Sequence, residues 1–323
     1  MKLNRKTLFT LSLTVVILIF GINWFVNYAD WETTRRLALS LDRLNLAVFA
    51  VIAVLNALIY PLPFKITTKN LSYVRAFVIR QSSFAIANTL PAGGTIGVAI
   101  IYVMMRAFQI SSVASFATIS ISGVFNVMMT LGMPMLSLVL LAISGQSSSR
   151  LVLPAIFAGI LLIIMISGFV GILRSAAFGE KVENLFARIM KAFKSQRTIS
   201  FTKFRISTYE ILKEKWVRLL AIGTAIQLFM FSALPVALFG LEQNIGFFEI
   251  LVAFAFARLV TLVPITPGGI GTTDGLMLAL LIGFGTTLPA ATASILIWRS
   301  VYYLPQVVLG LVSVIFWQLK INR

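Results

Sequence analysis

The sequence predicts an all-α, polytopic membrane protein, and its composition and long uncharged runs carry that prediction. Of 323 residues, 59% are hydrophobic and 11% are charged, and the mean hydropathy is +0.97. Soluble domains have roughly 45–50% apolar and about 25% charged residues, so the composition excludes an ordinary soluble protein. We therefore expect a single transmembrane domain over residues 1–323. The net charge of +17 lies mostly between apolar runs, which favours an anionic membrane surface and no nucleic acid as the partner.

The uncharged runs predict the individual spans, since a crossing helix needs about 20 apolar residues. Six full transmembrane helices are expected, over 8–28, 44–62, 113–143, 151–172, 217–240 and 288–318. Lys and Arg concentrate before the first span, after the second, between the fourth and fifth, and at the end of the chain. Because cytoplasmic loops carry the excess of basic residues, we expect both termini on the cytoplasmic side of the cell membrane.

Two further apolar regions are interrupted by glycine and proline. The first, from Tyr73 to Phe108, contains Pro91-Ala-Gly-Gly-Thr-Ile-Gly97, and the second, from Gly246 to Phe284, contains Pro267-Gly-Gly-Ile-Gly271. The piece from Leu276 to Phe284 is about 13 Å long as a helix and cannot cross alone. We predict two re-entrant helical hairpins, with full crossings, giving up to ten spans, as the alternative.

The two halves of the chain follow the same order, which predicts an inverted repeat over 1–150 and 151–323. Each half has two apolar spans, an arginine (Arg80 or Arg258), a glycine-rich break and a long apolar span. Inverted repeats in transporters place the substrate site between broken helices. The connection at 174–218 is expected to be a cytoplasmic loop with a basic amphipathic helix at 182–193 that lies on anionic lipid.

The residues that could carry chemistry are few. The chain has no Cys and no His, so we expect no metal site, no cofactor and no enzymatic activity. Broken helices turn backbone N–H groups into a cavity, and arginine binds phosphate with a planar fork. The residues predicted to bind a lipid phosphate are therefore Arg258, Arg299, Gly268, Gly269, Gly271, Asp274, Tyr303, Arg80, Gly93 and Gly94.

Asp274 leaves two interpretations open. It is the only acid between Glu249 and the C-terminus, so Arg299 or Arg258 is its expected partner. In one interpretation this pair is a buried salt bridge that holds the broken helix. In the other, arginines retain positive charge for a lipid headgroup, with Arg258 and Arg299 as the preferred contacts. Tyr303 shares a helix face with Arg299.

These motifs resemble a known family. The runs Pro267-Gly-Gly-Ile-Gly271-Thr-Thr-Asp274 and Arg299-Ser-Val-Tyr-Tyr303-Leu-Pro305 are similar to the patterns P-x-G-x-G-x-x-E and R-x-x-x-Y-x-x-P of the lysylphosphatidylglycerol synthase/flippase transmembrane-domain family. The likeness extends more loosely over most of the chain. It implies a bacterial or archaeal flippase-like protein in which these motif positions are functional. The sequence departs from the pattern by having Asp274 where Glu is usual. With no aminoacyl-transferase domain in these 323 residues, we expect the lipid-handling activity alone.

The expected function is a flippase that moves an anionic phospholipid or a polyprenyl-phosphate-linked lipid between leaflets. Two alternatives stay open: a non-catalytic membrane partner of a lipid-modifying or glycosyl-transferring enzyme, and a small-anion transporter. The sequence also leaves open whether the protein is a homo-oligomer.

Overall fold

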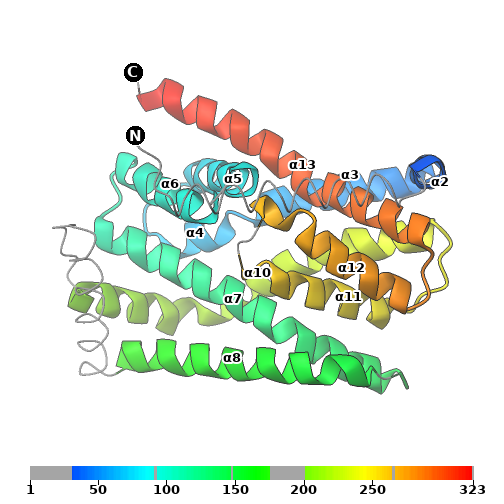
Figure 1. Ribbon diagram of the computed structural model, residues 1–323. Helices are drawn as coiled ribbons and strands as arrows, with labels where there is room; N and C mark the ends of the chain where they lie inside the picture. The colour runs from blue at the N-terminus through cyan, green and yellow to red at the C-terminus, as the bar shows by residue number, and fades with distance from the viewer. Residues whose placement is uncertain (1–30, 91–92, 147, 175–200, 264–265, 322–323) are drawn as a thin grey trace, which may run out of the picture.

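Every regular element that the structure describes is helical (Figure 1). The computed structural model describes residues 31–90, 93–146, 148–174, 201–263 and 266–321. In chain order the elements are α2 (Trp31–Leu39), α3 (Arg43–Ile59), α4 (Leu62–Thr67), α5 (Tyr73–Thr89), α6 (Gly93–Ala107), α7 (Ser112–Ile143), α8 (Ser149–Arg174), α10 (Phe201–Gly240), α11 (Phe247–Val260), the short 3-10 helix η1 (Pro267–Gly269), α12 (Thr272–Gly283) and α13 (Leu288–Ile321). The prediction of an all-α polytopic membrane protein is confirmed.

Five segments in the described ranges are long and apolar enough to cross a membrane. They are Arg43–Thr67, Ser112–Ile143, Ser149–Arg174, Thr202–Gly240 and Leu288–Gln318. They coincide with the second to sixth predicted spans. The first predicted span, 8–28, lies outside the described residues.

The predicted loop at 174–218 is partly wrong, because α10 already begins at Phe201 and continues unbroken for 40 residues to Gly240. Hydropathy identifies the part of a helix that crosses the bilayer, but it does not identify where the helix starts. The residues before the apolar run are rich in Lys, Arg and Glu, which are good helix formers, so the helix extends beyond the apolar segment. The predicted amphipathic helix at 182–193 lies outside the described residues.

The two interrupted regions form pairs of short helices. In the first pair, α5 has 17 residues and α6 has 15, which makes them about 25 and 22 Å long. In the second, α11 has 14 residues and α12 has 12, or about 21 and 18 Å. The hydrocarbon core of a bilayer is about 30 Å thick, so these lengths support re-entrant hairpins over full crossings.

The hairpins pack against helices from the other half of the chain. Helix α5 packs against α6 and, most extensively, against α13, whereas α11 packs most extensively against α7. Figure 1 shows the α5–α6 hairpin beside α4 at one end of the long helices and the α11–α12 hairpin at the opposite end. Each half thus contributes its last long helix to the hairpin of the other. This exchange is compatible with the inverted repeat over 1–150 and 151–323, which stays a prediction.

A glycine sets the contact between α5 and α13, and buried amides join both of these helices to α3. A Cβ atom at Gly310 would lie 2.2 Å from the carbonyl oxygen of Gln81, so only glycine permits this helix separation. Gln306 on α13 donates to Asn56 Oδ1 on α3 at 3.1 Å, and Gln81 on α5 donates to the Ala57 carbonyl at 3.1 Å. Such amide contacts are the polar links that hold helices together in membranes.

Candidate functional site

The glycine motif of the second hairpin forms a turn whose carbonyls face Arg299. Gly268 and Gly269 have φ values of +61° and +67°, a backbone conformation that favours glycine. This turn directs two carbonyl oxygens toward α13. The Arg299 guanidinium donates to the Gly268 carbonyl at 3.0 Å and to the Gly269 carbonyl at 3.2 Å.

Asp274 completes this arrangement from the first turn of α12. Its Oδ1 accepts from Arg299 Nε at 2.8 Å and lies 2.8 Å from Arg299 Nη2. Its Oδ2 accepts from the backbone N–H of Gly271 at 2.9 Å. The expected pairing of Asp274 is confirmed with Arg299. We call this set of four contacts, among Arg299, Asp274, Gly268–Gly269 and Gly271, the Arg299 clamp.

The Arg299 clamp uses the groups that the sequence analysis assigned to a phosphate. The positive end of α12 already has a carboxylate on it, and Arg299 has one ion pair and two carbonyl acceptors. The geometry therefore favours the salt-bridge interpretation for Arg299 and Asp274. Headgroup binding by Gly268, Gly269 and Gly271 stays a prediction that no contact in the structure tests.

The tips of the two hairpins touch at Tyr303. Its hydroxyl donates to the backbone carbonyl of Asn88, near the end of α5. Any side chain at Gly268 would come within 3.0 Å of Asn88 Oδ1 and 2.8 Å of the Tyr303 ring. In the first hairpin, Gly93 fits closely against the α5 backbone, since a Cβ there would lie 2.4 Å from the Ala87 carbonyl, whereas Gly94 faces open space. Tyr303 thus links hairpins that enter from opposite ends.

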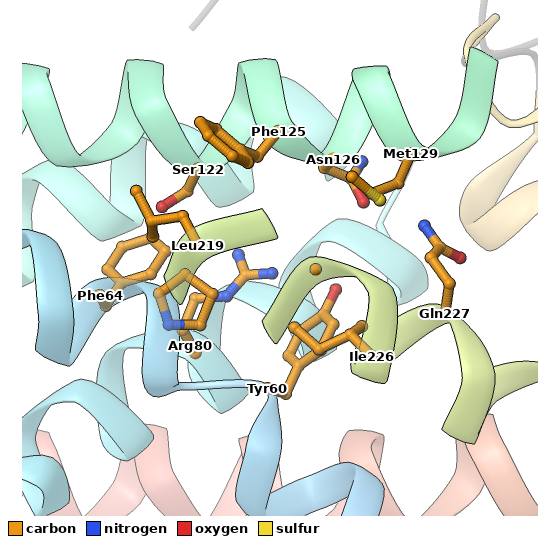
Figure 2. Close-up of a pocket in the computed structure, with 12 residues that line it drawn as sticks. Tyr60, Phe64, Arg80, Ser122, Phe125, Asn126, Met129, Leu219, Ile226 and Gln227 are labelled. Carbon is orange, nitrogen blue, oxygen red and sulfur yellow. The ribbon is translucent and has the colours of Figure 1, made fainter. Parts of the chain in front are cut away.

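A pocket lies among α3, α4, α5, α7 and α10, away from the Arg299 clamp (Figure 2). Its volume is about 50 Å³, enough for several water molecules or a small anionic group. The residues that line it are Tyr60, Pro63, Phe64, Arg80, Ser122, Phe125, Asn126, Met129, Leu219, Gly223, Ile226 and Gln227.

Arg80 is the charged residue of this pocket. Its guanidinium carbon lies 4.4 Å from the centre of the Tyr60 ring and 5.1 Å from that of Phe64. Aromatic faces attract a cation without neutralising it. Arg80 forms no ion pair and no side-chain hydrogen bond with the residues that the structure describes. Arg80 therefore presents a positive charge that no acid among the described residues compensates.

Polar groups without partners surround Arg80. Ser122 Oγ and Gln227 Oε1 are buried atoms that make no hydrogen bond. The Gln227 side chain has little access to solvent, since the residue is only 4% exposed. Asn126 lies between them along the wall of the pocket (Figure 2). Buried polar atoms in proteins are nearly always satisfied, so these groups indicate a polar occupant.

The sequence analysis named Arg80 as a candidate but did not identify Ser122 or Gln227. The available signal was a lone glutamine within the uncharged run of α10. In the described part of the chain, no three His, Cys, Asp or Glu residues are placed to hold a metal ion.

The fold and the site define a multi-pass helical membrane protein with two helical hairpins, the Arg299 clamp and the pocket at Arg80. The chain belongs to the lysylphosphatidylglycerol synthase TM region family, whose family model matches residues 9–310. This confirms the resemblance noted from the sequence and indicates a lipid-related function. A search of curated proteins finds no match for the chain.

Proposed function

We propose that this protein is a translocase that moves an anionic phospholipid or a polyprenyl-phosphate-linked lipid across the bilayer, and that Arg80 contacts the headgroup phosphate. The observation that carries the proposal is an uncompensated guanidinium in a pocket within the spanning helices. Insertion scales assign about 2.5–3.5 kcal/mol to an arginine at the centre of a membrane helix, and ionisable residues there commonly mark substrate pathways.

The chemistry of the pocket suits a phosphate group. The guanidinium fork binds phosphate oxygens in two places, and the Ser122 hydroxyl and the amides of Asn126 and Gln227 are further donors. The pocket is small, so in this proposal it holds the headgroup phosphate and the lipid tails remain in the surrounding bilayer. The Arg299 clamp has a separate role in this proposal: it holds the second hairpin against α13.

The same proposal places the protein in the cytoplasmic membrane, with both termini inside, and describes a transporter and not an enzyme. The basic residues support this orientation. Lys65 and Lys69 follow α3, and Lys213 and Arg218 on α10 are exposed near the same end of the bundle. Lys215 donates to the Ile66 carbonyl at 2.9 Å, which joins these two basic segments. A basic rim on the pocket side would attract anionic headgroups.

The proposal is tested in proteoliposomes containing a phospholipid with a fluorescent acyl chain. Reduction of the outer-leaflet fluorophore reports how fast the labelled lipid crosses. The wild-type protein should accelerate crossing over empty liposomes, and Arg80→Gln should reduce that acceleration at least tenfold. Arg75→Gln is the matched control, because Arg75 is an exposed arginine on the same helix, placed over Phe108 at 5.3 Å. Equal rates for wild-type and empty liposomes, or full activity of Arg80→Gln, would overturn the proposal.

The small pocket also fits a free anion, which makes small-anion transport the second candidate function. Uptake of radiolabelled inorganic phosphate into the same proteoliposomes distinguishes the two. Uptake that depends on Arg80 without any lipid crossing would replace the lipid translocase by an anion transporter.

A further inference from the structure

A second arginine without an ion pair in the described ranges lies on the other hairpin. Arg258, near the end of α11, has a buried Nε with no hydrogen-bond partner and forms no ion pair in the ranges that the structure describes. The acids of its own hairpin are engaged elsewhere. Asp274 belongs to the Arg299 clamp, and Glu249 accepts from the Gly246 N–H at 2.7 Å at the start of α11. Arg258 therefore has no acidic partner among the described residues.

Tyr302 connects the two arginines. Its ring meets Phe84 edge to face with ring centres 5.7 Å apart, and Phe84 meets Tyr60 in the same way at 5.7 Å. The Tyr60 ring in turn lies 4.4 Å from the guanidinium carbon of Arg80. Side-chain packing supports this placement. One helical turn earlier on α11 and α13, Phe254 and Trp298 meet edge to face with ring centres 6.1 Å apart. The next turn of each helix then carries Arg258 and Tyr302.

The two arginines come from different hairpins, Arg80 from α5 and Arg258 from α11. Both arginines are half-buried, and Tyr302 packs among aromatic rings, paired with Phe84 at 5.7 Å and stacked on Trp298 at 5.8 Å. A low-dielectric environment strengthens the interaction of each charge with any anion in the pocket. No carboxylate of the described residues forms an ion pair with either of these two positive charges.

We propose that the site prefers a dianionic phosphate monoester over a monoanionic phosphodiester, with Arg80 in direct contact and Arg258 adding selectivity from behind Tyr302. This inference rests on the proposed function and names its substrate class. A phosphate monoester carries about −1.5 to −2 charges at pH 7, whereas a diester carries one. A dianion neutralises both guanidinium groups, but a diester leaves one of them uncompensated in the membrane interior.

The test compares two lipids with identical labelled tails, phosphatidic acid as the monoester and phosphatidylglycerol as the diester, in the same proteoliposomes. We expect the wild-type protein to move the monoester about tenfold faster or more, since tenfold corresponds to ~1.4 kcal/mol of differential binding. Arg258→Gln should bring the ratio close to one mainly by slowing the monoester. Arg258→Lys should keep the ratio, because it keeps the charge. The exposed-site variant Arg75→Gln should also keep it.

The outcomes separate the two proposals. If neither lipid crosses faster than in empty liposomes, the proposed function fails. If both cross equally fast, the translocase stands and the monoester preference is refuted. A ratio that survives in Arg258→Gln, with the variant eluting as a folded protein, refutes the role of Arg258. Uptake of inorganic phosphate without movement of either lipid assigns the site to the free dianion and refutes a lipid substrate.

Discussion

The Arg299 clamp predicts an asymmetric response to removing its two charged members. Arg299→Met leaves the Asp274 carboxylate with one backbone N–H and also leaves the carbonyls of Gly268 and Gly269 without their donor. Asp274→Asn leaves the Arg299 guanidinium with both carbonyl acceptors and a neutral side chain beside it. The two side chains are only 15% and 20% exposed, so little solvent is available to either group.

The magnitudes follow from the contacts that each variant loses. Removing one partner of a buried ion pair costs about 3–5 kcal/mol. For Arg299→Met we expect a loss at the upper end of that range, about 4–5 kcal/mol, because two further carbonyls are left unsatisfied. For Asp274→Asn we expect about 2–3 kcal/mol, because the guanidinium keeps neutral acceptors. The double variant should cost clearly less than the sum of the two single variants, since both act on one interaction.

The assay is equilibrium unfolding in mixed micelles with increasing denaturing detergent, followed by tryptophan fluorescence. The free energies of the four proteins form a double-mutant cycle. Additive losses, or a larger loss for Asp274→Asn than for Arg299→Met, would refute the geometry described for the Arg299 clamp.

Two further predictions concern the contacts between the hairpins and α13. Gly310→Ala should loosen the α5–α13 interface and lower the free energy of unfolding by about 2 kcal/mol or more, because the new methyl group overlaps the Gln81 carbonyl. Gly123→Ala is its control: the site is open, so the same change should be neutral or stabilising by up to about 1 kcal/mol, and similar losses for both would contradict the contact. Tyr303→Phe removes the hydroxyl that donates to the Asn88 carbonyl and should cost about 1 kcal/mol in the same unfolding assay. An unchanged stability in Tyr303→Phe would show that the hairpin tips are held together by other contacts.

The sequence predicted the spans well because a bilayer requires each of them to have about 20 consecutive apolar residues. Length and hydropathy identified five helices of the described chain, and the glycine clusters marked both broken regions. Asp274 was paired with Arg299 or Arg258 by elimination, because no other nearby acid exists in that stretch. Local signals were sufficient for these features.

Local sequence patterns could not predict which arginines of the site are neutralised by a partner and which are not. Of the two arginines preferred as headgroup contacts, Arg258 and Arg299, it is Arg299 that donates to the carbonyls of Gly268 and Gly269. That choice depends on two positive φ values, which no pattern in the sequence specifies. The pocket at Arg80 is built from five helices distant in sequence, so Gln227 and Ser122 could be associated with it only in three dimensions.

The exchange of long helices between the halves has a consequence for synthesis of the chain. About 180 residues separate the end of α6 from the start of α13, which covers the α5–α6 hairpin. At a synthesis rate of about 5–20 residues per second, α13 follows the α5–α6 hairpin, which carries Arg80, after roughly 10–35 s. During this interval the nascent hairpin exposes a charged side chain and two short helices to lipid. We expect the membrane-insertion machinery to bind the hairpin until α13 is made.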